Sequence, residues 1–393
     1  MNENLLKPEI QEFILKNIDA EVVPFLLKKP FFEGVSNKEL VQQIISKKKS
    51  KTKLPTWYNT PNIYFPDKLH IEQASSEITA QYKATVVSGK SLVDVTGGFG
   101  IDTNFFALKM EVIHHCETNQ DLSEIATNNF KVLGRKNIKI VSGDGLKFLR
   151  ESKSRFNWVY LDPSRRNDQN GKVFFLKDCF PDVTEHLDLL FQKSNNVLIK
   201  TSPILDISVG IRELRFVKEI HIVALKNEVK ELLWVLQANF NGEIAVKTVN
   251  IDRQKKDTFN FTFQEEKRAV PNFAAPQKFL YEPNSAILKS GAFSLLTTRY
   301  SIGKLHEHSH LYTSKELKDF PGRKFKIEKV EPFSKKVLKN INLKKANITI
   351  RNFPDSVDSL RKRFKILDGG EEYLFFTTDL HGAKIIICCK KLS

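Results

Sequence analysis

The chain has 393 residues, a net charge of +16 and a hydrophobic fraction of 41%, which together predict two or three folded domains with ordinary cores. No apolar run approaches the length of a bilayer span, and the first residues lack the pattern of a signal peptide, so we expect a cytoplasmic protein with no membrane partner. Four cysteines without a C-x-x-C pair argue against a disulfide framework and fit a reducing compartment.

Residues 1–70 have the pattern of a small helical region. Apolar side chains recur at helical spacing over residues 10–18, and a second helix is predicted from Asn37. The lysine-rich segment 47–53 has the composition of a flexible linker. Residues 55–66, rich in Pro, Asn and Tyr, are predicted to be the loop into the next domain.

Residues 91–100 predict the entrance of a βαβ unit. A short apolar run ends at Asp94 and is followed by Thr-Gly-Gly-Phe-Gly, after which a helical pattern begins. A dinucleotide fold favours G-x-G-x-x-G, but Thr103 stands three residues after Gly100. The loop instead places Asp94, Thr96, Gly98 and Gly100 at alternate positions.

Three further predicted strands also end in acids. Glu117, Asp144 and Asp162 close the second, third and fourth strands, and Lys200 lies at the end of the fifth. Strands that alternate with helices at this spacing predict an α/β fold with a doubly wound, mostly parallel, Rossmann-like sheet. Two strands around a turn at residues 226–227 predict a terminal antiparallel hairpin.

From Asp94 to about Leu236 the order of motifs resembles class I S-adenosylmethionine (SAM) methyltransferases, with Thr96 in place of the first glycine. The blocks that sharpen this match are 71–84, 161–166, 281–289, 320–323, 350–354 and 368–373. They resemble a little-studied bacterial methyltransferase family that carries a ferredoxin-like segment and a C-terminal THUMP-like domain. The resemblance implies a SAM-dependent enzyme acting on RNA.

These patterns and the resemblance predict four parts in the chain. They are a helical region (1–70), a methyltransferase domain (71–240), a connector with a small ferredoxin-like segment (241–320), and a basic α+β THUMP-like domain (321–393).

The loop pattern and the resemblance together predict the cofactor site. A carboxylate at Glu117 can accept both ribose hydroxyls of a nucleoside, and the resemblance assigns the adenine amino group to Asp144. The candidate residues for SAM, and for its product S-adenosylhomocysteine, are Asp94, Thr96, Gly97, Gly98, Gly100, Glu117, Asp144 and, by resemblance alone, Gln73.

Chemistry is predicted at Asp162 and Pro163. The tetrad Asp-Pro-Ser-Arg resembles the (D/N)-P-P-(Y/F) of N-methyltransferases without its aromatic residue, and no cysteine stands in the motif of a covalent pyrimidine mechanism. We therefore expect direct SN2 transfer from SAM to a base nitrogen, with Asp162 accepting the proton or aligning the base. Arg165 and Arg166 are candidates for phosphate contacts. Lys200 either neutralises substrate charge or is an ordinary loop lysine.

The basic charge is concentrated in one segment. Residues 322–365 hold fourteen Lys or Arg and four Asp or Glu, a local net of +10, which favours a polyphosphate partner such as tRNA or rRNA. A solvated lysine-rich face is the competing explanation. His306, His308 and His310 are predicted on one side of a strand, where they cannot complete a coordination sphere, so we expect no metal.

Three other functions remain open at this point. The chain could be an RNA-binding protein with an inactive methyltransferase core, although the four strand-end acids argue against decay. It could also methylate a protein or small molecule. A nicotinamide oxidoreductase is disfavoured by the loop spacing and the hairpin.

Overall fold

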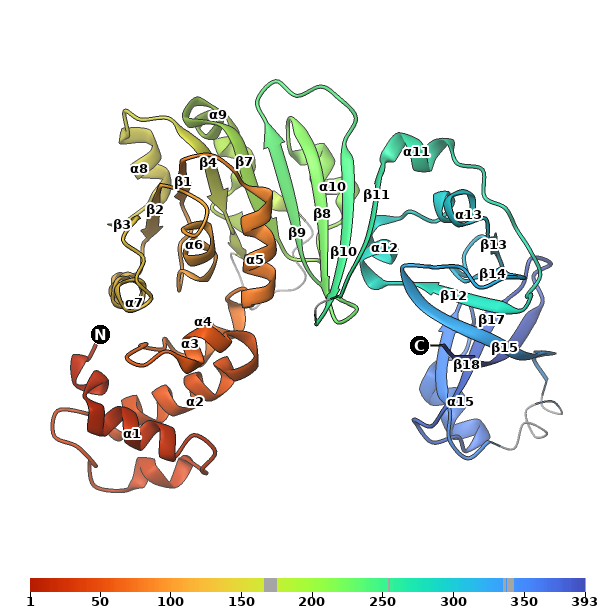
Figure 1. Cartoon of the computed structure of the whole chain (residues 1–393), viewed down its shortest axis with the longest axis horizontal. Coiled ribbons are helices and arrows are strands. Elements are labelled where there is room, and N and C mark those ends of the chain that lie inside the picture. Colours follow the sequence, from red (N-terminus) through yellow and green to blue (C-terminus); the bar gives the residue numbers. More distant parts are fainter. Residues whose placement is uncertain (166–174, 254, 335–336, 338–342, 393) are drawn as a thin grey trace. The chain divides into compact units, whose positions relative to one another are not determined.

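Figure 1 shows the computed structural model of the chain, which describes residues 1–165, 175–253, 255–334, 337 and 343–392. The chain divides into two compact units. The first is Met1–Val217 with Leu233–Asn241, and the second is Lys218–Leu232 with Gly242–Ser393.

The first unit begins with short helices: η1 (Glu3–Leu6), α1 (Pro8–Lys16), η2 (Val23–Leu27), α2 (Asn37–Lys53), α3 (Pro55–Asn59) and α4 (Lys68–Gln73). The lysine-rich segment is not a linker, since it forms the last turns of α2. Lys47 is only 4% exposed and its ammonium lies over the rings of Tyr58 and Phe65, at 5.5 and 5.3 Å. An aromatic platform can thus bury a lysine whose neighbours in sequence suggest solvent exposure.

The expected loop at residues 55–66 is also largely packed. It contains α3, and Asn129 of the methyltransferase region holds its far end by two hydrogen bonds. The Tyr64 N–H donates to Asn129 Oδ1 at 2.9 Å, and Asn129 Nδ2 donates to the Tyr64 carbonyl at 2.8 Å. Buried Glu77 accepts from the backbone N–H and hydroxyl of Thr56. The N-terminal helices are therefore docked on the rest of the first unit.

From residue 77 onward helices and strands alternate (Figure 1). They are α5 (Glu77–Val86), β1 (Ser91–Asp94), α6 (Ile101–Phe106), β2 (Val112–Glu117), α7 (Gln120–Val132), β3 (Ile138–Ser142), α8 (Gly145–Glu151), β4 (Phe156–Leu161), β5 (Ser164–Arg165), η3 (Leu176–Asp178), β6 (Cys179–Phe180), α9 (Val183–Lys193), β7 (Ser194–Thr201) and α10 (Ile207–Glu213). Asn119, Asp144, Asp182 and Asp206 cap the helices α7 to α10 with their side chains.

The central strands are parallel. β1 pairs with both β2 and β4, β2 pairs with β3, and β4 pairs with β7. The chain runs outward through β2 and β3 on one side and through β4 and β7 on the other. The point where strand order reverses lies between β1 and β4, whose carboxyl ends hold Asp94 and Asp162, and such a point is where open α/β sheets bind ligands.

The expected hairpin is present. β8 (Val217–Leu225) and β9 (Glu228–Gln237) are joined by Lys226 and Asn227, which have φ of 50° and 62°, the positive values that a two-residue type I′ turn requires. The order of the nine-stranded sheet is β11-β10-β8-β9-β7-β4-β1-β2-β3, so β9 is inserted between β7 and β8.

The sheet continues beyond this hairpin. β10 (Ala245–Asp252) pairs in parallel with β8, and β11 (Lys255–Thr262) pairs antiparallel with β10. Both strands fall in the range 241–320, where we expected a connector. The hairpin is therefore not the edge of the sheet.

The second unit continues with a seven-stranded sheet of order β13-β14-β12-β15-β18-β17-β16. Its elements are α11 (Phe263–Arg268), β12 (Phe279–Pro283), α12 (Ser285–Ser290), α13 (Leu295–Tyr300), β13 (Gly303–Lys304), β14 (Tyr312–Ser314), β15 (Gly322–Pro332), β16 (Asn347–Arg351), α15 (Val357–Phe364), β17 (Glu372–Thr378) and β18 (Lys384–Lys391). Leu280, Phe325, Phe375 and Ile387 are fully buried on one side of this sheet, and Leu360, Leu374, Phe376 and Ile386 are fully buried on the other.

The histidine-rich segment differs from its predicted form. Residues 306–310 form a turn rather than a strand, so the three imidazoles do not share one face of a strand. Within the described ranges, no group of three or more His, Cys, Asp or Glu side chains is arranged to hold a metal ion. No helix in the same ranges combines the length and apolar character needed to cross a bilayer.

Candidate cofactor and catalytic site

Asp94 organises the loop between β1 and α6. Its side chain is 1% exposed, and it accepts the Thr96 backbone N–H at 3.1 Å and the Thr103 hydroxyl at 2.6 Å. Thr103 lies 2.9 Å from Nδ1 of buried His115 on β2, so the carboxylate connects the loop, α6 and the neighbouring strand. Burial raises the pKa of Asp94 to about 7. The structure thus shows a loop-shaping role for Asp94.

Two glycines of the loop are required by close packing. A Cβ at Gly97 would lie 2.3 Å from the His115 ring, and one at Gly100 would lie 2.4 Å from Cζ of Phe130. Gly100 also has φ of +84° and precedes α6 as its N-cap. At Gly98, with φ of +58°, the nearest atom to a side chain's Cβ would be the Thr96 carbonyl oxygen, 3.9 Å away. The loop therefore leaves the half-buried backbone of Gly98 without a covering side chain.

Glu117 lies at the end of β2 against this loop. Its Oε2 accepts the Gly98 N–H at 2.7 Å, and its Oε1 accepts the Asn119 N–H at 2.7 Å. The Thr118 hydroxyl also donates to Oε1 at 3.4 Å, so Oε2 is the oxygen that keeps a lone pair for a further donor. Asp144 is exposed at the end of β3, where its Oδ1 caps α8 by accepting from Leu146 at 2.8 Å. Both acids lie at the carboxyl ends of strands, as predicted.

Thr96, at the position of the expected glycine, connects the loop to β4. Its hydroxyl oxygen accepts the backbone N–H of Asp162 at 2.7 Å. A glycine could not make this contact, which gives a physical reason for the departure from the usual pattern. The Asp162 carboxylate forms an ion pair with the Lys200 ammonium, so the structure brings these two predicted residues together.

A buried network of charges lies behind this ion pair, and the sequence did not predict it. Lys83 of α5 is 0% exposed, and its ammonium lies 3.2 Å from the Asp102 carboxylate of α6. Asp102 also accepts the hydroxyls of Ser75 at 2.9 Å and Tyr160 at 2.7 Å. Burial alone would raise the pKa of Asp102, but Lys83 and Lys200, with the two hydroxyl hydrogen bonds, outweigh it and lower the pKa.

Alternating charges therefore run from Lys83 through Asp102 and Lys200 to Asp162. Lys83 and Ser75 belong to block 71–84 of the resemblance, yet no local pattern distinguishes a buried lysine from an exposed one. Gln73 is exposed at the end of α4, and its role in cofactor binding stays a prediction. Its neighbour Ser75 donates to Asp102 of the buried network.

The structure describes two of the three remaining candidate residues, Pro163 and Arg165. Pro163 follows Asp162 and is half-buried. The Arg165 backbone pairs with Cys179 in the short β5–β6 ladder. Arg166 lies outside the described residues.

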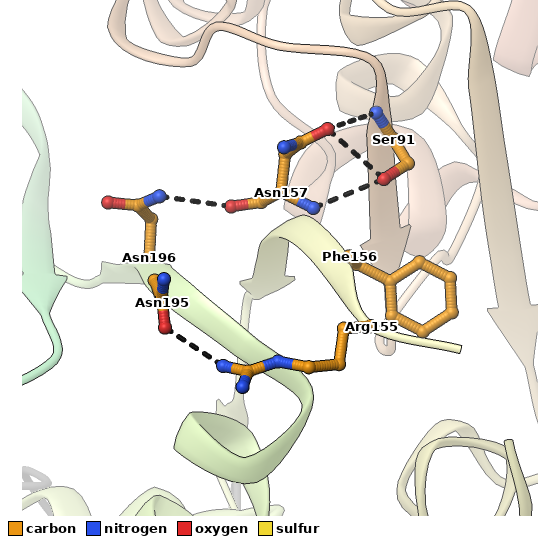
Figure 2. A pocket seen from close by; sticks show the side chains of 6 residues that line it. All are labelled: Ser91, Arg155, Phe156, Asn157, Asn195 and Asn196. Carbon is orange, nitrogen blue, oxygen red and sulfur yellow. Dashed lines mark hydrogen bonds between the residues drawn. The ribbon is translucent and has the colours of Figure 1, made fainter. Parts of the chain in front are cut away.

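Figure 2 shows a polar pocket of about 280 Å³ at the opposite edge of the sheet, lined by Ser91, Arg155, Phe156, Asn157, Asn195 and Asn196. These residues stand at the amino ends of β1, β4 and β7. Asn157 Oδ1 accepts from the Ser91 N–H at 3.0 Å, and Arg155 donates to Asn195 Oδ1 at 2.8 Å. These bonds tie strand starts together, and the pocket is not part of the candidate site.

The solved structure of a "putative methyltransferase" from Porphyromonas gingivalis W83 superposes on the whole chain. The two sequences are 32% identical, the match covers 100% of this chain and 99% of that chain, and the TM-score is 0.91. Family models match residues 279–321 as a ferredoxin-like domain and residues 322–391 as a THUMP domain-like region. The chain belongs to this class I methyltransferase family.

Two more distant structures each match less than half of this chain. A "putative methyltransferase" from Escherichia coli is 17% identical and covers 42% of this chain and 85% of its own, with a TM-score of 0.30. TrmK of M. capricolum, solved with S-adenosyl-homocysteine, is 16% identical, and the match covers 41% of this chain and 68% of TrmK, with a TM-score of 0.33. Among curated proteins, none matched the chain.

Proposed function

We propose that this family member is a cytoplasmic SAM-dependent methyltransferase that modifies a base nitrogen of tRNA or rRNA by direct displacement. The observation that carries the proposal is the hydrogen bond between the half-buried Gly98 backbone and Glu117. It lies at the edge of the sheet where Asp162 follows β4, which supports a cofactor site next to the proposed catalytic carboxylate.

The residues present fit SAM. Glu117 Oε2 has a spare lone pair for a ribose hydroxyl, and a second hydroxyl could replace the long 3.4 Å contact of Thr118 with Oε1. Gly98 offers backbone without a side chain, and Asp144 lies at the next strand end. When bound, SAM supplies an electrophilic methyl group. Asp94, Thr96, Gly97 and Gly100 would shape the loop around it, and Gln73 stays a proposal from the resemblance alone.

Asp162 is proposed to align the base and accept its proton. Lys200 holds the Asp162 carboxylate by an ion pair, and the Thr96 hydroxyl holds its backbone. The proton of an attacking exocyclic amine can therefore be accepted at a fixed position. Pro163 and Arg165 are proposed as neighbours of the substrate, and Arg166 extends that role outside the described residues.

The cysteines do not supply a covalent route. Burial raises the pKa of the thiols of Cys116 and Cys389 far above its ordinary value, and it also raises that of Cys388. Cys179 is buried as well. Because a covalent pyrimidine mechanism needs a thiolate, these positions favour direct transfer.

RNA is the proposed substrate because of the second unit. Its residues 322–391 match a THUMP domain-like model and include the segment with a net charge of +10. The basic segment argues against a protein or small-molecule substrate, which remains the alternative. Binding that weakens steeply with salt would support RNA.

The first test is calorimetric titration with S-adenosylhomocysteine. We expect micromolar binding, about −8 kcal/mol, that is lost in Glu117→Ala. Glu111→Ala is the matched control, because Glu111 precedes the same strand at its opposite end and is exposed. Equal affinity in both variants would reject Glu117 as the ribose ligand, and no binding by the folded wild type would reject the cofactor.

A second candidate is an RNA-binding protein with an inactive core. The Lys200–Asp162 ion pair is the observation that favours it, because the contact that fixes the Asp162 carboxylate also neutralises it and makes it a weaker base. Lys200→Met separates the two functions. Transfer that disappears in this variant supports the enzyme, whereas RNA binding without any cofactor binding in the wild type supports the second candidate.

A further inference from the structure

Four segments that are far apart in the sequence meet in the second unit. They are residues 281–285, 304–310, 322–323 and 350–352, and three of them coincide with blocks of the family resemblance that the methyltransferase site does not use. Glu282 of β12 contacts Arg323 and Arg351 of two other segments, and residues 304–310 are joined to them through Asn352.

Glu282 holds two arginines. Its side chain is 3% exposed, its Oε2 accepts from Arg323, which faces it across β12 and β15, and its Oε1 accepts from Arg351 at 2.7 Å. Both guanidinium groups remain accessible, with 35% and 34% of their side chains exposed. One carboxylate balances one of the two charges, so the trio keeps a net charge of +1.

The turn at residues 304–310 adds more positive charge. Lys304 is buried, and its ammonium donates to the Glu307 carbonyl at 2.7 Å. The turn is joined to the residue after Arg351 by a 3.1 Å contact between Asn352 Nδ2 and His306 Nδ1. His306 Nδ1 also accepts the His308 N–H at 3.0 Å, which places the ring proton on Nε2 and makes that nitrogen a donor.

His310, at the end of this turn, lies in a positive electrostatic field. Its ring stacks on Phe293 at 3.7 Å, and its backbone has φ of +51°, a strained value for histidine. Burial, together with the charges of Lys304, Arg351 and His308, lowers the pKa of His310 to about 4. The imidazole therefore stays neutral in a positive field.

Several buried donors here have no acceptor. Among the described residues, Arg351 Nε, His310 Nδ1 and the Asn284 amide Nδ2 are buried without a hydrogen-bond partner. Two of these nitrogens can only donate, and a buried donor without a partner costs free energy. Because these atoms have almost no accessible surface, an acceptor-rich anion would contact the exposed guanidinium groups of Arg323 and Arg351, and the unmatched N–H groups would add to the positive field that it meets.

Nearby carboxylates do not fill that role. Glu307 is exposed, and the Glu266 carboxylate already accepts three backbone N–H groups of residues 293–295. We propose that a cluster of three cations, Arg323, Arg351 and Lys304, together with the neighbouring imidazoles of His306, His308 and His310, binds a phosphate group, carried by an RNA strand or by a free nucleotide. Its RNA form rests on the proposed function, whereas phosphate binding itself does not.

The test measures binding of a fluorescent single-stranded RNA to the full chain as a function of salt. Arg351→Gln and Arg323→Gln should each weaken binding about tenfold and reduce the salt slope by about 0.7. Arg215→Gln is the matched control, because Arg215 is an exposed, ion-paired arginine of the first unit. A folded Arg351→Gln that binds RNA as tightly as Arg215→Gln overturns the proposal.

Glu282→Gln separates anion binding from a purely structural role. Removing this buried negative charge raises the local net charge, so RNA affinity should increase. If the trio only joined β12 to the neighbouring strands, the variant would lose thermal stability with no gain in affinity, and that result overturns the proposal. Thermal unfolding of each variant confirms that it is folded.

Competition identifies the source of the phosphate. Displacement of the RNA by adenosine 5′-monophosphate, but not by adenosine, supports a terminal or free phosphate, and displacement by unlabelled RNA alone supports an internal one. No binding of either probe overturns the proposal. Titration with S-adenosylhomocysteine is independent, so failure of the cofactor site is distinguishable from failure of this one.

Discussion

Replacement of Lys83 by methionine tests the buried charge network most directly. Lys83 is fully buried, and its ammonium lies 3.2 Å from Asp102 and 3.1 Å from the Ser75 hydroxyl. The variant keeps the length of the side chain but leaves Asp102 without its nearest counter-charge. Removing one partner of a buried ion pair costs about 3–5 kcal/mol, and we expect a loss of that size for Lys83→Met and for Asp102→Asn.

The double variant should be less destabilised than the sum of the two. Because Lys83→Met with Asp102→Asn removes both charges, we expect a coupling energy of about 2–3 kcal/mol. Lys16→Met is the control. Lys16 forms an exposed pair with Glu12 on one helix, and because solvent screens such a pair, its loss should change the stability very little.

Urea unfolding followed by tryptophan fluorescence provides the assay. All three tryptophans, Trp57, Trp158 and Trp234, belong to the first unit, so the signal reports that unit alone. Single variants within 1 kcal/mol of wild type (about the size of an exposed pair), or costs that simply add in the double variant, would refute the reasoning.

Three further results are expected. Asp162→Ala should abolish methyl transfer while S-adenosylhomocysteine still binds; retained transfer in an assay with radiolabelled SAM contradicts this role. Gly100→Ala should cost about 2–5 kcal/mol, from the positive φ and the clash with Phe130, whereas Gly134→Ala, with φ of +71° and open space, should cost about 1–2 kcal/mol in the same unfolding assay. Hydrogen bonds from the His221 imidazole and the Lys247 ammonium lower the pKa of Glu219 to about 2. Glu219 should therefore contribute about 1–2 kcal/mol to the stability of the fold above pH 4.5, and this contribution should be lost as the pH falls toward 2. Circular dichroism should show this acid dependence disappearing in Glu219→Gln, and an unchanged pH profile would contradict it.

The sequence by itself determined the class of the fold and the positions of the strand-end acids. Apolar runs that end in Asp94, Glu117, Asp144 and Asp162 are local patterns, and parallel strands necessarily bring such ends to one edge of a sheet. The glycine loop is local too, since a residue without Cβ is needed where the backbone turns back on the next strand. These features were predictable because each depends on neighbours in sequence.

Only the tertiary structure decided which charges are buried. Lys47 and Lys83 resemble any surface lysine in sequence, and the aromatic rings and the carboxylate that bury them come from other elements. The two strands after the hairpin, β10 and β11, could not be predicted from the sequence either, because β10 pairs with the distant strand β8 and β11 pairs with β10.

The charged cluster around Glu282 also depends on the tertiary structure. Arg323 and Arg351 stand 41 and 69 residues beyond it in the chain, and no periodicity links positions that far apart. Charge pairing of this kind depends on distance in space, which only the folded chain sets.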